Sequence, residues 1–410
     1  MSKKLIVLNT LLLATLMGYA TGSVLPFLGH RGGGMAYTFS GQQKNAESLW
    51  FNPAAASHPR GVFMVSAGIS VSQEYTAYQM AVPSVYQANT INPIQLPWYV
   101  YVSSSFHDRF TFGLAVNSYN FSDISWQEEN WAGRYIVKQS RIKNTVVQPS
   151  VSFSISDQWY VGAGISITAS ALNYSRALAV RDQNREGHVE IAGNTVQWGI
   201  NSGIYYQPTD QISFGLSYKS AINLSFNEAE AFFQVPASLG SFFAGENSVS
   251  ANFYLPALLD LHASAQLSPN WTIALAAGLQ IPQNENNTIF NFIHNNTYLQ
   301  DLYIYREEKM QLSGRLGGEY SAAEFLQLRA GLFFQEGASG TDFFSPEKPD
   351  ANKLGITGGI SLLPLERLTI DISFVYIHSP AVQQQYIPAS FIGTYQSAVF
   401  SSGIGITYSF

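Results

Sequence analysis

The chain ends in the stretch Ser397-Ala-Val-Phe-Ser-Ser-Gly-Ile-Gly-Ile-Thr-Tyr-Ser-Phe410, in which large and small residues alternate. In a β-strand, alternate residues point to opposite faces. One face carries large apolar side chains: Phe400, Ile404, Ile406, Tyr408 and Phe410. The other carries small or polar residues: Ser401, Gly403, Gly405, Thr407 and Ser409. This pattern is typical of a wall between lipid and a wet or narrow interior.

The same alternation recurs upstream, for example from Trp159 to Ser170. Six short segments rich in turn formers separate such strands. They lie at 107–109, 156–158, 208–210, 268–270, 321–324 and 364–366. Seven longer polar stretches alternate with them, at 74–95, 123–139, 182–188, 227–249, 283–300, 337–352 and 379–395. The pattern predicts an all-β protein, a transmembrane antiparallel β-barrel of about 14 strands with short turns at one end and long loops at the other.

The composition supports a barrel over a soluble β-sandwich, which also alternates. Only 12% of the residues are charged, against about 25% in an ordinary soluble domain. There is no cysteine, so no disulfide supports the fold. The formal net charge of −6 argues against nucleic acid as a partner.

The first residues predict a secretory signal peptide over residues 1–20. Lys3 and Lys4 precede an apolar run from Leu5 to Met17, and small residues follow. The alternative is an N-terminal membrane anchor, but the run is shorter than the roughly 20 residues that a membrane helix needs.

Residues 21–60 show no strand pattern, and we expect the barrel to occupy residues 61–410. The segment is rich in Gly and Ala, and Asn52-Pro53 favours a turn or a helix start. We interpret it as a hatch, or plug, inside the lumen. The alternative is a disordered tail, but Leu49, Trp50 and Phe51 would then be exposed to water.

The order of several motifs resembles the FadL/OmpP1/TodX family of outer-membrane transporters of long-chain fatty acids and hydrocarbons. The first motifs are Gly34-Met35-Ala36-Tyr37 and Asn52-Pro53-Ala54, which resemble the family's N-terminal hatch. Further likeness lies in Trp159 to Arg176, in Leu255-Pro256 with Asn270-Trp271, and in the closing Tyr408-Ser409-Phe410.

The resemblance implies a protein of the outer membrane of a Gram-negative bacterium. It would capture hydrophobic compounds such as long-chain fatty acids in an apolar lumen pocket and release them sideways through the wall. It would contact outer-membrane lipid and lipopolysaccharide, and its C-terminal Phe410 would be the signal for the barrel assembly machinery. No cofactor is implied. In the family the wall opens at a strand kink, which would fall near Tyr119 and Asn120, where this chain has no glycine.

The resemblance also implies substrate-binding residues. Arg176 matches the family's arginine for the substrate carboxylate, and Arg306, with Lys309 next, matches a second basic residue. Phe27 and Leu25 match the family's substrate-contacting free end. The alternative for Arg176 is a salt bridge to an acidic side chain in the lumen. Gly34, Ala36, Asn52, Pro53 and Ala54 would belong to the hatch architecture.

Nothing in the sequence singles out a catalytic or metal site. The seven histidines are scattered, without a His-Glu-x-x-His motif or paired metal spacing. We therefore expect no enzyme. The functional alternatives to the transporter are a general porin, which needs an open polar lumen, and a structural or adhesive surface protein.

Overall fold

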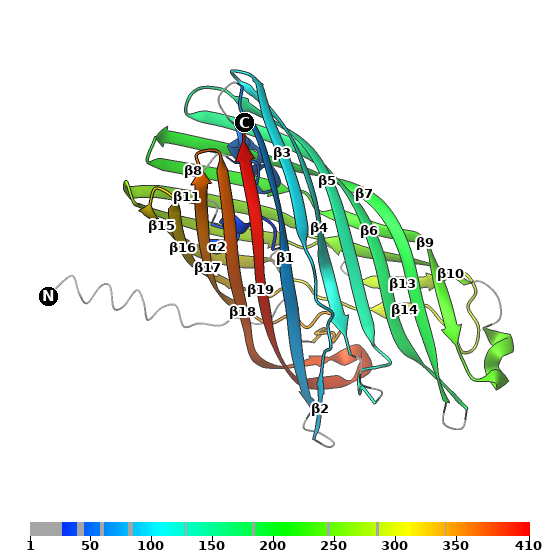
Figure 1. Cartoon of the computed structure of the whole chain (residues 1–410). Coiled ribbons are helices and arrows are strands. Elements are labelled where there is room, and N and C mark those ends of the chain that lie inside the picture. The colour runs from blue at the N-terminus through cyan, green and yellow to red at the C-terminus, as the bar shows by residue number, and fades with distance from the viewer. Residues whose placement is uncertain are drawn as a thin grey trace.

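The fold is a closed antiparallel β-barrel that surrounds short helices (Figure 1). The computed structural model describes residues 27–38, 45–57, 61–80, 85–126, 128, 130–182, 185–243, 247–283, 287–340 and 342–410. The predicted signal peptide and Leu25 lie outside the described residues.

The wall contains 14 strands, as predicted. β1 and β19, the blue and red strands of Figure 1, lie side by side and close the ring. In order around the barrel, the strands are β1 Phe63–Met80, β3 Trp98–His107, β4 Phe110–Ser125, β5 Gln139–Ser154, β6 Trp159–Asp182, β7 Arg185–Thr209, β8 Ile212–Lys219, β11 Ala257–Ser268, β12 Trp271–Ile281, β15 Gln311–Ala323, β16 Leu326–Gln335, β17 Lys353–Leu365, β18 Leu368–Tyr386 and β19 Phe391–Ser409.

The remaining strands extend the sheet at the long-loop end. They are β2 Tyr86–Asn89, β9 Ile222–Gln234, β10 Asn247–Leu255, β13 Thr288–Phe292 and β14 Leu302–Ile304. Much of what we predicted as loop is therefore strand, notably within 74–95, 227–249 and 379–395. In these extensions the apolar side chains, such as Phe226 and Val249, are buried inside, whereas the outer face is mostly polar, for example at Asn223 and Glu230. The apolar outer face on which the sequence prediction relied is therefore missing there.

The six short turns are confirmed at the positions that the sequence predicts. Both barrel ends emerge on that side, where Met64 pairs with Ser409. The N–H of Phe410 donates a hydrogen bond to the carbonyl of Phe63 (2.8 Å), and their ring centroids lie 5.2 Å apart. The C-terminus is thus fixed in the wall; its recognition by the assembly machinery stays a prediction.

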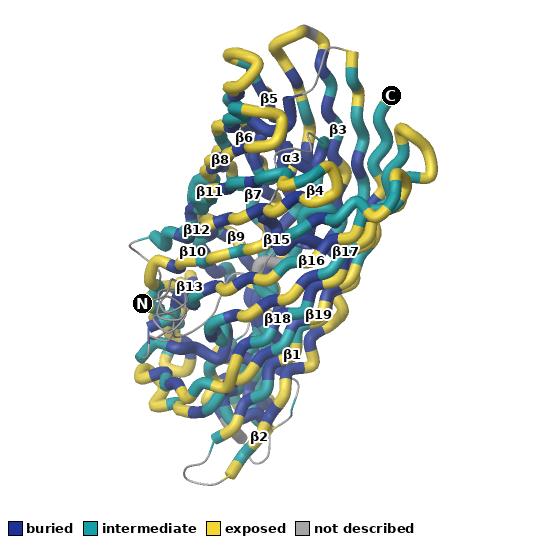
Figure 2. The backbone as a smooth tube through the Cα atoms, turned by 90° about the vertical axis from the view of Figure 1, so that its left-hand side faces the viewer, coloured by how far each residue is buried: buried dark blue, intermediate teal, exposed yellow. Residues whose placement is uncertain are grey.

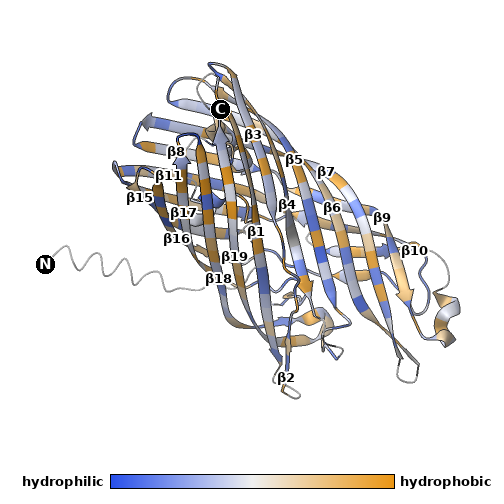
Figure 3. Ribbon diagram, viewed as in Figure 1, coloured by the Kyte–Doolittle hydropathy of each residue, from blue (hydrophilic) through white to orange (hydrophobic). Residues whose placement is uncertain are grey.

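The two predicted faces of the last strand are the two faces of the wall. Phe400, Ile404 and Ile406 are exposed on the outside, whereas Ser401 and Gly405 are buried. Figure 2 shows the alternation of buried and exposed residues along the strands, and Figure 3 shows the matching hydropathy bands. An apolar outer band is what a bilayer requires of a closed barrel.

The helices of the chain are short. α2 (His30–Gly34), α3 (Ser48–Phe51) and the 3-10 helix η1 (Pro53–Ala56) pack on the inner faces of the strands, whereas η2 (Ala237–Phe242) and η3 (Ile387–Ala389) lie in the long connections. Within the part of the chain that the structure describes, no helix has the length and apolarity to cross a membrane.

A large apolar cluster fills the barrel interior at the long-loop end. Its largest fully buried rings include Trp126, Trp131, Tyr174, Phe226 and Phe290. Trp126 and Trp131 stack with centroids 4.1 Å apart. The space between the long loops and the short helices is therefore packed with side chains.

Candidate functional site

The first part of the N-terminal segment lies against β16, β17 and β18. The Thr357 hydroxyl donates to the carbonyl of Gly34 and accepts from the N–H of Ala36, both at 3.0 Å. A Cβ added to Gly34 would lie 2.9 Å from the Cα of Gly359, so the two backbones meet closely. Glycine permits this approach because it has no side chain.

The Asn52-Pro53-Ala54 motif lies against β6 and β7. The Asn52 side chain caps η1 by accepting from the N–H of Ala54 (3.0 Å), and its Nδ2 donates to the carbonyl of Ile204 (3.2 Å). A Cβ on Gly203 would lie 2.0 Å from Asn52 Oδ1, and one on Gly162 would lie 2.4 Å from the nitrogen of Ala54. Two wall glycines thus provide the space for this motif.

A buried ionic network joins the same segment to the wall. Arg329 pairs with Glu319 (2.7 Å) and with Asp371 (3.1 Å), and Arg31 of α2 pairs with Glu319 (3.2 Å). Glu47, which precedes α3, accepts a hydrogen bond from the Tyr99 hydroxyl (2.9 Å). Because buried charges require partners, this network fixes the position of the segment relative to β15, β16 and β18.

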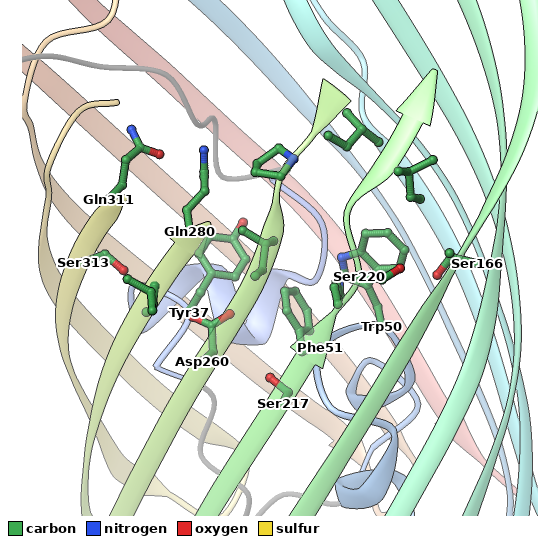
Figure 4. A pocket seen from close by; sticks show the side chains of 18 of the residues that line it. Tyr37, Trp50, Phe51, Ser166, Ser217, Ser220, Asp260, Gln280, Gln311 and Ser313 are labelled. Carbon is green, nitrogen blue, oxygen red and sulfur yellow. The ribbon is translucent and has the colours of Figure 1, made fainter. Parts of the chain in front are cut away.

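A cavity of about 190 Å³ lies between this segment and the wall formed by β4 to β15 (Figure 4). Apolar side chains of the segment and of the wall line the cavity. Tyr37, Trp50 and Phe51 come from the segment. The other apolar side chains are Tyr119, Val146, Ile200, Ile222, Leu255, Pro256, Leu258 and Leu279. An apolar cavity of about 150 Å³ is sufficient to bind benzene, so this one can hold an organic molecule.

The cavity also contains charged side chains. The Lys219 ammonium nitrogen lies 3.5 Å from the centroid of the Trp50 ring, which is a cation–π contact. Asp260, in the same lining, pairs with Arg315 at 3.4 Å. Among the described residues, no carboxylate forms an ion pair with Lys219 within 4.0 Å. The Lys219 amine is therefore available to pair with an acidic group of a molecule in the cavity.

The substrate-binding residues predicted from the resemblance lie elsewhere. Arg176 donates to the carbonyl of Tyr135 (3.2 Å), and Arg306 pairs with Glu347 (2.9 Å). Lys309 is exposed, and Phe27 is buried, with its carbonyl accepting from Ser70 Oγ (2.6 Å). None of these residues lines the cavity. Their role in binding stays a prediction.

Sequence reasoning missed Lys219, although a signal was present. Lys219 ends a strand, Ile212–Lys219, in which Phe214, Leu216 and Tyr218 point outward. Its position in the alternation therefore places it on the inward face. A lysine on the inner wall is a candidate ligand for an anionic group.

The connection between β16 and β17 lies over the interior at the long-loop end. Glu347 accepts from Ser140 of β5 (3.2 Å) in addition to pairing with Arg306, and the Trp126 indole donates to the carbonyl of Pro346 (3.0 Å). Asp350 is buried and accepts from the N–H of Ala338 (2.9 Å). Burial raises the pKa of Asp350 to about 7.

Comparison with known proteins identifies the family. The family model described as outer membrane protein transport protein (OMPP1/FadL/TodX) matches residues 11–410. No curated protein sequence matches the chain significantly.

Three solved structures illustrate the similarity of fold. A FadL homologue of Pseudomonas aeruginosa has a TM-score of 0.79 at 17% identity, covering 96% of this chain and 99% of the other. The Pseudomonas putida toluene transporter TodX has a TM-score of 0.73 at 14% identity, covering 95% and 99%. The Ralstonia pickettii toluene transporter TbuX has a TM-score of 0.68 at 15% identity, covering 92% and 98%.

Proposed function

The chain belongs to the OMPP1/FadL/TodX family of outer membrane transport proteins, and from this premise we propose that it takes up compounds with an apolar body and a carboxylate, such as long-chain fatty acids. It is an outer-membrane β-barrel for the transport of hydrophobic compounds, and it is not an enzyme. The substrate class is our proposal, since relatives include a FadL homologue as well as toluene transporters.

The observation that carries the proposal is the position of Lys219, a basic side chain that lines the cavity next to Trp50. With a neutral hydrocarbon in the cavity, the Lys219 amine would have no acidic group of the described residues within ion-pair distance, whereas a carboxylate would pair with it. Trp50 and the apolar lining would then contact the part of the tail next to the carboxylate. Asp260 and Arg315 in the same cavity already pair with each other, so Lys219 is a basic group that remains to pair with a carboxylate.

We further propose that residues 21–60 act as the hatch that closes the lumen. The close contacts at Gly34, Asn52 and Ala54 and the ionic network at Arg31 support this role. A general porin would need an open polar lumen, whereas the apolar cluster around Trp126 fills the interior at the long-loop end. This argues against the porin alternative.

The test compares two ligands of equal length, a long-chain fatty acid and the corresponding alcohol, on the purified protein. We expect Lys219→Met to weaken fatty acid binding by about one to two decades, because a hydrogen bond to a charged group contributes roughly 1.5–3 kcal/mol. Alcohol binding should hardly change. Isothermal titration calorimetry gives both affinities.

Arg176→Met tests the carboxylate partner that the family resemblance predicts, a residue that does not line the cavity. If Lys219 holds the carboxylate, this variant leaves both affinities unchanged. A loss of fatty acid affinity in this variant alone would assign the carboxylate to Arg176. Equal losses for both ligands in Lys219→Met would contradict the proposed substrate class.

A further inference from the structure

The hairpin formed by β8–β9 and β10–β11 bends at the level of the cavity. The bend lies at Ser220-Ala221 in one arm and at Pro256 in the other, while pairing keeps its register across it: Lys219 opposes Leu258, and Ile222 opposes Leu255. Proline has no N–H to donate to a ladder. Pro256 thus marks the point where the hairpin departs from the regular wall.

The neighbouring strand β7 does not follow the bend. It pairs with β8 through residues 201–209 and with β9 through residues 188–192. Between them, residues 193–199, all of which the structure describes, have no ladder partner on this side, although they stay paired with β6 on the other. We call this interval, between residues 193–199 of β7 and residues 222–229 of β9, the β7 seam.

Side-chain contacts, not ladder pairing, close the β7 seam. A Cβ added to Gly193 would lie 2.7 Å from the Cβ of Ala229, and one added to Gly199 would lie 2.8 Å from Ile222 Cγ1. At the end of the seam next to the β7–β8 ladder, Ser220 forms two hydrogen bonds with Ile200, at 2.8 and 2.9 Å. The seam can therefore widen without breaking a regular ladder.

The β7 seam connects the cavity to the lipid-facing surface. Gly199, Ile200, Ser220 and Ile222 line the cavity (Ser220 is visible in Figure 4). Ile200 is also 47% exposed on the outside, next to Trp198, which is 68% exposed. At membrane depth, backbone without regular pairing is tolerated only where it is buried in protein or lines a cavity. An interrupted ladder at this place points to a functional opening.

We propose that hydrophobic compounds pass between the cavity and the outer leaflet through the β7 seam. This inference rests on the proposed function and adds the place of the passage. It moves the opening away from the region of Tyr119 and Asn120 in β4, which the family resemblance predicts.

The flank of β4 is also interrupted: its residues 119–124, which are among the described residues, have no ladder partner on the β3 side, and the register with β5 shifts between Asn120 and Ser122. Hydrogen bonds from residues 91–92 cross this flank at the far end of β4. Asn92 accepts from the N–H of Ser125 (2.8 Å) and donates to the carbonyl of Glu74 (3.1 Å). The N–H of Ile91 donates to the carbonyl of Ser125 (2.9 Å). These hydrogen bonds connect the end of β4 to β1. The structure favours the β7 seam because both of its edges line the cavity, through Gly199 and Ile200 on one side and Ser220 and Ile222 on the other, whereas β4 contributes Tyr119 to the lining.

Engineered disulfides test the proposal, since the chain has no cysteine of its own. Gly193→Cys with Ala229→Cys locks the β7 seam, because the two Cβ positions lie 2.7 Å apart and a separation of the strands by about 1 Å brings them to the roughly 3.8 Å of a disulfide. Ser213→Cys with Ser264→Cys is the matched control in an intact ladder, where the two hydroxyl oxygens lie 2.6 Å apart. Asn92→Cys with Ser125→Cys locks the flank of β4.

Uptake of a radiolabelled long-chain fatty acid is measured in cells that express each variant, oxidised and then reduced. We expect oxidation of the Gly193/Ala229 pair to lower uptake at least fivefold and reduction to restore it. The other two pairs should keep wild-type uptake in both states. If the protein with the Gly193/Ala229 cysteine pair does not fold into the membrane, Ala229→Leu is the second variant. Its larger side chain narrows the same seam and should lower uptake.

Fatty acid binding to the purified oxidised proteins separates this inference from the proposed function. Wild-type binding with blocked uptake supports the β7 seam. Unchanged uptake in the oxidised Gly193/Ala229 pair, or a loss confined to the Asn92/Ser125 pair, overturns it and leaves the proposed function standing. Absence of binding in the wild-type protein overturns the proposed function itself.

Discussion

At Gly203 a single missing side chain determines how the N-terminal segment meets the wall. Gly203→Ala would place a Cβ 2.0 Å from Asn52 Oδ1. The Asn52 amide would have to move, and its hydrogen bonds to the carbonyls of Ile204 and Leu216 would be lost. We expect a loss of about 1–3 kcal/mol in the stability of the segment, measured as faster proteolysis within residues 45–57 of the folded protein.

Gly314→Ala provides the control, because nothing lies within 4 Å of a Cβ at that position. It should leave proteolysis of the segment at the wild-type rate. If Gly203→Ala behaved in the same way, the close contact between Asn52 and the wall would not hold the segment.

The sequence pattern around a residue predicts which face of a strand its side chain occupies. It does not predict which distant residues that side chain contacts. The alternation in Ile404 and Ile406 predicts the lipid face from neighbouring residues alone. The contact between Lys219 and Trp50 depends on the placement of a segment far away in the sequence. A role of Arg176 in substrate binding follows from the family resemblance and stays a prediction; its hydrogen bond to the carbonyl of Tyr135 is likewise a tertiary contact that no local pattern shows.

Among the elements, the connection between β16 and β17 contains a titratable group with a raised pKa. The pKa of buried Asp350 is about 7, above its ordinary value of 3.8. A carboxyl with a raised pKa stabilises the folded loop fully below its unfolded pKa, and the effect is lost as the pH rises through 7. Lys348 and Lys353 oppose the shift, and Glu308 adds to it.

We therefore expect the loop to open more readily at high pH. Between pH 4.5 and 6.5, protection of the amides of residues 342–352 against hydrogen exchange should fall by about tenfold per pH unit, after correction for intrinsic exchange. Asp350→Asn keeps the shape without the charge and should remove this dependence. Equal slopes in the two proteins would show that Asp350 does not control the loop.

The strands of the wall were predictable to different extents along their length. The six short turns and the lipid-facing parts follow from local patterns. The run Gln383-Gln384-Gln385 has no apolar alternation, and it is strand because it pairs with β19. Such pairing above the membrane is a tertiary effect, so the sequence pattern alone predicted loop there.

For the molecule as a whole, the ionic network couples the N-terminal segment to one side of the wall. Glu319 comes from β15, Arg329 from β16 and Asp371 from β18, and Arg31 from α2 completes the group. The Arg329 side chain is fully buried. Its removal would leave two acidic groups with Arg31 as the remaining cation of the network, so the segment and the wall should lose stability together.

We expect the wild-type protein to show no large steady current in a planar bilayer, because the segment and the apolar cluster occupy the lumen. Arg329→Met should lower the stability by about 3–5 kcal/mol, as for other broken buried ion pairs, and should produce frequent openings as the segment shifts. Arg141→Met is the control, since Arg141 pairs with Asp123 of the neighbouring strand and not with the segment. Large steady currents from the wild-type protein would contradict a closed lumen. Silent recordings from Arg329→Met, in a protein shown to be destabilised, would mean that the network supports the wall without holding the segment in place.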